Sequence, residues 1–245
     1  VTGGVTGGSS GSGSTISGTL VNPTNVAQTA TYTVTPTSGA SGNCVGSTFT
    51  VTVTVSPKPS IGDKTAEICS GNGFSVSPTN GVGGDIVPAG TKYTWTVSAN
   101  TNVTGQGAQN VGQSSIGQTL TNLTNVVQTL VYTVTPSVGG TCTGGTFTVT
   151  VTVNPKPVIP AQTRTICSGE SFDVSLENSN PTASTIVPSG TTYSWSAPVV
   201  TGGVTGGASG SGSSSISGTL VNPTNVVQTA TYTVTPTSGA SGNCV

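Results

Sequence analysis

Residues 48–55 read Thr-Phe-Thr-Val-Thr-Val-Thr-Val, and residues 146–153 repeat these letters without a change. Strict alternation of apolar and polar residues is typical of a β-strand, because successive side chains point to opposite faces. It places Phe49, Val51 and Val53 on one face and the threonines on the other. A strand of this kind belongs to an antiparallel sheet with one face in a core and one in water. No stretch has helical periodicity, so the sequence predicts an all-β protein.

The chain is built from repeats of about 100 residues. Pro57-Lys58-Pro59 returns 98 positions later as Pro155-Lys156-Pro157. This period is the size of an immunoglobulin-like antiparallel β-sandwich. We therefore expect tandem sandwich repeats, with the C-terminal part of a first repeat at 1–56, a complete repeat at 57–154, and a third repeat at 155–245 that lacks its last strand. Residues 1–45 and 200–245 are nearly identical, which suggests a segment of a longer tandem array.

Five aromatic residues recur at positions that a sandwich core uses. Trp95 and Trp195, in Tyr-Thr-Trp and Tyr-Ser-Trp, take the place of the buried strand-C tryptophan of such folds. Tyr32, Tyr132 and Tyr232 stand where a tyrosine corner would. The residue two positions after each tyrosine is valine. We expect apolar packing to replace the inter-sheet disulfide of antibody domains there.

The five cysteines suggest a disulfide within each repeat. We expect Cys69 to pair with Cys142 and Cys167 with Cys244, and Cys44 to have a partner upstream of residue 1. This pairing requires Cys69 to lie on a first edge segment that runs beside the last strand of its repeat. Disulfides indicate an oxidising, extracellular location. Buried free thiols are the alternative.

Composition argues against several functions. Charged residues are 4% of the chain, against about a quarter in an average domain. Five Lys/Arg and no long apolar run speak against nucleic-acid binding and membrane insertion. The absence of histidine and of Cys-x-x-Cys excludes Ser-His-Asp catalysis and the usual zinc sites. We expect no enzyme, no cofactor and no metal, and a mechanical role, because Pro-Lys-Pro joints are short and stiff.

The repeat motifs also resemble a known family. Ile-Cys-Ser-Gly, Tyr-x-Trp, Thr-Tyr-Thr-Val-Thr-Pro and Phe-Thr-Val-Thr-Val-x-Val-x-Pro-Lys-Pro are similar to the PKD-like and Ig-like repeats of giant cell-surface adhesins of gliding Bacteroidetes. The resemblance extends over essentially the whole chain. It implies export by type IX secretion, attachment to the outer membrane through regions outside this chain, and contact with an extracellular surface or polysaccharide.

These observations favour a segment of a long extracellular filamentous adhesin, which serves as a rod-like spacer and contact surface in gliding or attachment. Two other functions stay open. One is an accessory, non-catalytic module array of a secreted polysaccharide-degrading enzyme, which a flanking catalytic domain would reveal. The other is a self-assembling surface fibre subunit in which strands exchange between chains.

Overall fold

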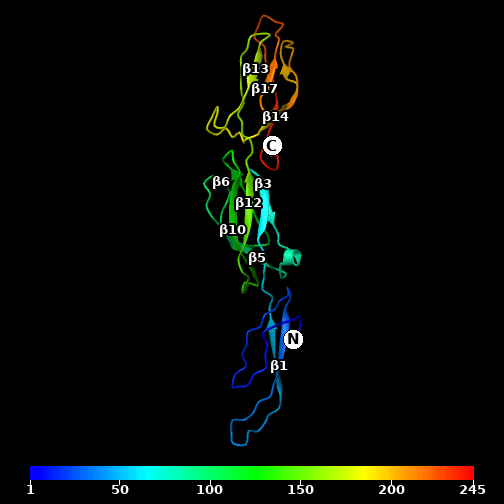
Figure 1. Cartoon of the computed structure of the whole chain (residues 1–245), viewed down its shortest axis with the longest axis vertical. Coiled ribbons are helices and arrows are strands. Elements are labelled where there is room, and N and C mark those ends of the chain that lie inside the picture. Colours follow the sequence, from blue (N-terminus) through cyan, green and yellow to red (C-terminus); the bar gives the residue numbers. More distant parts are fainter.

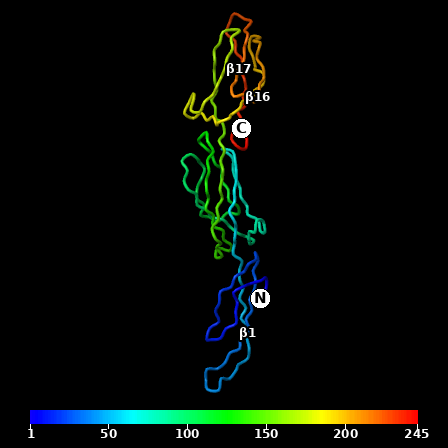
Figure 2. Tube along the Cα trace, viewed as in Figure 1, coloured from blue at the N-terminus to red at the C-terminus, as the bar shows by residue number.

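The computed structural model describes all residues from 1 to 245. Three bodies follow one another along the long axis, each formed by one of the repeats (Figure 1). The Cα trace shows the same elongated arrangement, with the N-terminal repeat at one end and the third repeat at the other (Figure 2). Residue 1 lies in the first body, and the chain end turns back toward the second (Figure 1). The molecule is a rod of three repeats.

The second repeat is a two-layered sandwich. One layer is a sheet in the order β3-β12-β10-β5-β7, with β11 beside β10. The pairs β4-β8 and β6-β9 face it. The strands are β3 (Lys64–Cys69), β4 (Gly73–Val76), β5 (Lys92–Val97), β6 (Val103–Thr104), β7 (Gln109–Gln113), β8 (Ile116–Thr119), β9 (Thr121–Asn122), β10 (Gln128–Val138), β11 (Cys142–Thr143) and β12 (Phe147–Asn154). The single helix is a 3-10 turn, η1 (Val82–Gly84), so the all-β prediction is confirmed.

The core of this repeat lies between its two layers. β12 contributes Phe147, Val149, Val151 and Val153, whose exposed fractions are between 0% and 3%. The intervening threonines are only partly buried. Thirteen buried residues form one apolar cluster. The alternating pattern brings apolar residues of the strands into this cluster, because every second side chain of a strand points inward.

The first repeat presents the same strand sequence in a different environment. β1 (Gln28–Val34) pairs with β2 (Phe49–Val55), and Val34 lies opposite Phe49. Phe49 is 48% exposed, whereas its counterpart Phe147 is 3% exposed. The reason is that residues 1–56 contain no counterpart of β4, which faces β12 across the core of the second repeat, and none of Tyr93 on β5, whose ring packs against Phe147.

The third repeat has several short sheets and no counterpart of β12. Its strands are β13 (Ser171–Val174), β14 (Thr192–Trp195), β15 (Val199–Val200), β16 (Gly210–Ser213), β17 (Ile216–Thr219), β18 (Ala230–Thr231) and β19 (Val234–Thr237). The pairs are β13-β17 and β15-β18, and the three-stranded sheet is β16-β14-β19. Its buried apolar cluster has only three residues, Val174, Tyr193 and Ile216.

An asparagine turn precedes the central strand in all three repeats. In the second repeat, the Asn122 side chain donates to the Val126 carbonyl at 2.7 Å and accepts from the Thr124 backbone N–H at 2.9 Å. Asn22 and Asn222 make the same two bonds. Asn122 also donates to the carbonyl of Val153 on β12 at 3.1 Å. The turn therefore ties the last strand to the loop before β10.

Candidate functional site: the joint between the second and third repeats

The backbone of the joint is held by prolines and by strand pairing on both sides. β12 ends at Asn154, and Pro155-Lys156-Pro157 follows. Pro155 and Pro157 are buried, whereas Lys156 is exposed. Val158 then forms a β-bridge with Ile186 of the third repeat, through backbone bonds of 2.9 and 2.8 Å. The fixed φ of proline and this bridge leave the connection few degrees of freedom.

The first joint is built in the same way. Pro57-Lys58-Pro59 leads into a bridge between Ser60 and Ile86, with backbone bonds of 3.0 and 2.7 Å. Pro59 is fully buried. The Pro-Lys-Pro motif thus connects consecutive repeats by one common geometry.

β3 brings Cys69 to the end of the second repeat that faces the third. This strand runs parallel to β12, and its register places Cys69 opposite Asn154. The next residue, Ser70, donates its backbone N–H to the Asn154 carbonyl at 2.9 Å. The expectation that Cys69 lies on an edge segment beside the last strand is confirmed. Cys69 is therefore adjacent to the joint.

A hairpin of the third repeat reaches back to the same place. Ser238 donates its backbone N–H to the Cys244 carbonyl at 2.9 Å, which closes the hairpin. Gly242 has a φ of +82°, and a Cβ there would lie 3.4 Å from the Asn154 Nδ2 and 3.8 Å from the Cys69 Sγ. Glycine provides both the left-handed conformation and the close approach.

A disulfide between Cys69 and Cys244 closes the joint, with 5.5 Å between the two Cα atoms. The sequence separation is 175 residues. A cross-link over so long a loop restricts the unfolded chain by roughly 5 kcal/mol. Because the bond joins two repeats, it constrains their relative position as well as their unfolding.

The predicted pairs Cys69–Cys142 and Cys167–Cys244 are wrong. Cys142 and Cys167 are free, as is the exposed Cys44. The physical reason is strand direction. Cys142 precedes β12, whereas parallel pairing puts Cys69 beside the far end of β12. Eight strand residues separate these ends by about 27 Å, and a disulfide requires Cα atoms within about 7 Å.

Glu67 lies beside the disulfide, where residues of both repeats line one hollow. Its carboxylate accepts a hydrogen bond from the Asn154 Nδ2 at 2.7 Å. The bond from Asn154, and then a bond from the Ser241 side chain, lower the pKa of Glu67 below its ordinary value. Ser241 belongs to the hairpin of the third repeat. A hollow of about 450 Å³ lies here, lined in part by Glu67, Asn72, Asn154 and Gly242.

Sequence reasoning missed this joint as a site. The cysteines recur with the period of the repeat. This periodicity is compatible with disulfides inside one repeat and with disulfides across a joint, so it does not distinguish the two. Asn154 is the one residue whose sequence sets this joint apart, because Ser56 stands at the corresponding place before the first Pro-Lys-Pro.

The other carboxylates lie apart and make structural contacts. Asp85 is buried and forms an ion pair with Lys64 at 2.8 Å. Asp63 accepts the Thr148 backbone N–H at 2.6 Å, and this bond is the main cause of its lowered pKa. Glu170 accepts the backbone N–H of Cys167 at 3.2 Å. That the chain is not an enzyme stays a prediction.

The two tryptophans have their indole N–H groups engaged by backbone. Trp95 is 4% exposed, and its Nε1 donates to the Gly107 carbonyl at 3.1 Å. Trp195 is half-buried and donates to the Ala208 carbonyl at 3.1 Å. Trp95 thus has little surface left to stack on a sugar ring.

The three equivalent tyrosines differ in burial. Tyr132 is fully buried, and Tyr32 and Tyr232 are half-buried. The Tyr132 hydroxyl donates to the Gln118 Oε1 at 2.9 Å, a side-chain acceptor instead of the backbone acceptor of a tyrosine corner. Burial raises the pKa of Tyr132 to about 12. Burial also raises the pKa of Tyr93, Tyr193 and Tyr232.

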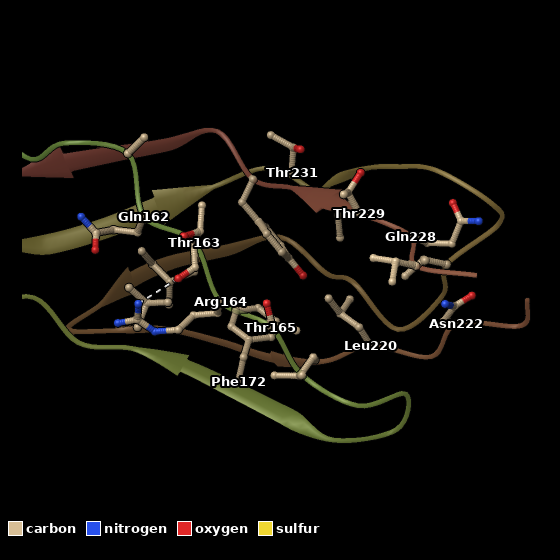
Figure 3. Close-up of a pocket in the computed structure, with 18 of the residues that line it drawn as sticks. Gln162, Thr163, Arg164, Thr165, Phe172, Leu220, Asn222, Gln228, Thr229 and Thr231 are labelled. Carbon is tan, nitrogen blue, oxygen red and sulfur yellow. Dashed lines mark hydrogen bonds between the residues drawn. The ribbon is translucent and has the colours of Figure 1, made fainter. Parts of the chain in front are cut away.

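A cavity of about 960 Å³ opens in the third repeat. Gln162, Thr163, Arg164 and Thr165 cross it without forming a strand, and Phe172 and Leu220 lie along its wall (Figure 3). In the second repeat the corresponding space holds β12, between β3 and β10. The cavity is therefore the place of a last strand.

Comparison with known proteins agrees with this organisation. A family model described as a PKD-like domain matches residues 1–59, 66–157 and 164–245. No curated protein matches the chain. No helix of the chain has the length and apolarity that a bilayer crossing requires. PKD-like domains are typical of extracellular, adhesion-type repeat modules. Because the three matches cover nearly the whole sequence, the chain belongs to the PKD-like domain family.

Proposed function

We propose that this chain is a rod-like spacer segment of a long extracellular filamentous adhesin. The observation that carries the proposal is the joint between the second and third repeats, which prolines, a β-bridge and the Cys69–Cys244 disulfide hold together. A connection with so few free torsion angles keeps consecutive repeats in line. Aligned repeats span a long distance, and spanning a distance is the task of a spacer.

The resemblance of the repeat motifs supports a finer assignment. They are similar to the repeat region of the gliding-motility adhesin SprB, a cell-surface protein of Bacteroidetes. We infer a role in gliding or surface attachment, with type IX secretion and outer-membrane attachment supplied by regions outside these residues. The partner is an extracellular surface or polysaccharide, and neither nucleic acid nor direct membrane insertion is involved.

The surface chemistry suits a spacer. With 4% charged residues, the repeats have little long-range electrostatic attraction for other molecules, and salt has little to screen. We expect the length of the rod to be about 100 Å and the same in dilute buffer and in 1 M NaCl. Small-angle X-ray scattering measures this maximum dimension. A compact particle would contradict the proposal.

The cellular role requires a test on cells that make the protein. An antibody against the chain should label intact cells, and external protease should remove the label. An in-frame deletion of residues 57–154 should leave attachment in place but bring the cell closer to the surface, because one repeat of reach is lost. Labelling only after permeabilisation, or an unchanged distance, would overturn the proposal.

A fibre subunit is the second candidate, and the cavity of the third repeat favours it. A β-strand such as β2 (Phe49–Val55) of another copy has the alternating apolar face that this space accommodates. Polymers should then grow with concentration. A chain with residues 46–56 appended after Val245 should stay monomeric, because its own strand fills the cavity. Light scattering of both chains distinguishes this candidate from the spacer.

The third candidate, an accessory array of a polysaccharide-degrading enzyme, predicts glycan binding by the isolated repeats. Trp95 is buried, so the half-buried Trp195 is the better platform. A glycan array probed with the chain and with Trp195→Ala tests this. Binding that the substitution abolishes would favour the enzyme-associated array over the spacer.

A further inference from the structure

The five cysteines occupy two kinds of position, and the Cys69–Cys244 bond joins one of each. We call Cys69 and Cys167 turn cysteines, because each begins a Cys-Ser-Gly turn. We call Cys44, Cys142 and Cys244 hairpin cysteines, because each lies in the hairpin after the central strand.

The two turn cysteines have matching surroundings. Asn72 donates its backbone N–H to the Cys69 carbonyl at 3.0 Å, and Glu170 donates to the Cys167 carbonyl at 3.1 Å. The serine after each cysteine accepts the backbone N–H of Asn122 or Asn222 at 2.9 Å. Cys167 therefore lies at the far end of the third repeat as Cys69 lies at the far end of the second.

The hairpin cysteines share one register. Cys44 and Cys244 accept the backbone N–H of Ser38 and Ser238 at 2.9 Å, and Cys142 pairs with Val138. The glycine two positions after Cys44 and after Cys142 donates to the carbonyl of Pro36 or Pro136 at 2.8 Å. The hairpin of Cys142 has a turn shorter by two residues, but this shortening affects only its tip.

The hairpin of Cys142 also lies at a joint. A Cβ at Gly144 would collide with the carbonyl oxygen of Pro59, so this hairpin packs against the Pro-Lys-Pro connection to the first repeat. Cys142 is half-buried there. Residues 1–56 contain no Cys-Ser-Gly turn, which explains why Cys142 is free while Cys244 is bonded.

We propose that every joint of this repeat array is closed by one disulfide between the turn cysteine of one repeat and the hairpin cysteine of the next. Cys142 and Cys44 then bond to the turn cysteines of preceding repeats, and Cys167 bonds to the hairpin cysteine of a following repeat. The inference rests on the tandem arrangement of PKD-like repeats and is independent of what the array adheres to.

The chemistry of each bond is a two-electron oxidation. Two thiols lose two protons and two electrons and form one S–S bond. The electrons pass to a disulfide oxidant, such as glutathione disulfide or a disulfide oxidoreductase, whose own S–S bond is reduced to two thiols. The result is a chain of covalent clasps that runs beside the backbone, joint after joint.

The first experiment uses the chain itself. It is refolded with glutathione disulfide, its free thiols are alkylated at low pH, and chymotryptic peptides are identified by mass spectrometry. We expect the Cys69–Cys244 cross-link and alkylation of Cys44, Cys142 and Cys167. A cross-link between Cys69 and Cys142, or between Cys167 and Cys244, would overturn the proposal.

The second experiment completes the first repeat by placing a copy of residues 155–199 before Val1. We expect a new cross-link between Cys142 and the added copy of Cys167. With Cys142→Ser, the added cysteine should become fully alkylated. A bond from the added cysteine to Cys44, or free thiols at both positions while Cys69–Cys244 forms, would refute the proposal.

A third chain keeps the test decisive if the N-terminal extension does not fold. Here a copy of residues 46–143 follows Val245, which completes the third repeat and adds the hairpin of a fourth. Cys167 should now pair with the added copy of Cys142, and alkylation of Cys167 in the folded chain contradicts the proposal. Missing cross-links in the second and third chains leave the spacer function untouched, because that function is tested by reach and by cell attachment.

Discussion

Asn122 shows how one side chain connects a turn to a strand. Its Nδ2 donates to two carbonyls, those of Val126 and Val153, and its exposed fraction is 2%. Asn222 makes the same turn but is only half-buried and has no last strand to bind. The two asparagines are therefore a matched pair, in which only the burial and one hydrogen bond differ.

Replacing Asn122 with aspartate should destabilise the second repeat by about 3 kcal/mol, because a buried carboxylate would face two carbonyl oxygens. Asn222→Asp should cost less than about 1 kcal/mol in the third repeat, since water solvates the new charge. Hydrogen exchange measured by mass spectrometry reports the opening free energy of β10 and β19 separately. Equal losses in the two repeats would contradict this account.

Tyr132 makes stability depend on alkaline pH. Its pKa is raised to about 12 by burial, whereas the unfolded chain has a value near 10. Between these values the unfolded state loses the phenolic proton and the folded state keeps it. The free energy of unfolding therefore falls as pH rises, by about 1.4 kcal/mol per pH unit from this group.

Tyr132→Phe should make this alkaline loss smaller, although it removes the bond to Gln118 at neutral pH. Urea unfolding at pH 8, 10, 11 and 12 measures the difference. Both chains should carry Cys44→Ser, Cys142→Ser and Cys167→Ser, so that thiolates cannot exchange with the disulfide. The same pH slope in both chains would show that Tyr132 ionises freely in the folded state.

At the scale of elements, β2 and β12 have the same Phe-Thr-Val-Thr-Val-Thr-Val sequence in different environments. Phe147 packs edge-on against Tyr93 with 6.3 Å between ring centroids, whereas Phe49 is 48% exposed. The free energy that a strand contributes thus depends on the layer that faces it.

Phe147→Ala should lower the stability of the second repeat by about 3–5 kcal/mol, the usual cost of removing a buried aromatic ring. Phe49→Ala should leave that repeat unchanged. Urea unfolding followed by Trp95 fluorescence, with Trp195→Phe to silence the third repeat, measures both. A large effect of Phe49→Ala on this signal would mean that β2 packs against the second repeat in solution.

At the scale of the whole molecule, the disulfide and the prolines share the task of aligning the repeats. Two equivalent valines, Val126 and Val226, are 56% and 59% exposed and suit fluorescent labels on non-natural amino acids. Single-molecule energy transfer between them should give a narrow distance distribution in the oxidised chain. Reduction, or Cys69→Ser with Cys244→Ser, should broaden it.

The control for this measurement is the chain with Cys44, Cys142 and Cys167 replaced by serine. It should keep the narrow distribution, because these thiols are free. A distribution that stays narrow after reduction would show that Pro155, Pro157 and the Val158–Ile186 bridge hold the joint without the disulfide.

The sequence by itself determined the all-β class, the repeat period and the apolar face of each strand. Alternation is a local pattern, because successive side chains of any strand point to opposite faces, whatever the strand packs against. The sequence predicts an edge segment beside the last strand, but it does not predict that β3 runs parallel to β12. The membership of the chain in the PKD-like domain family agrees with the predicted sandwich repeats.

Only the tertiary structure decided which cysteines meet and which of two identical strands is buried. The repeat period is compatible with a bond from Cys69 to Cys142 or to Cys244, so the direction of β3 and the reach of the Cys244 hairpin select the partner. Phe49 and Phe147 likewise differ only in what covers them. Both outcomes depend on contacts between residues far apart in the chain, and no local sequence pattern encodes such contacts.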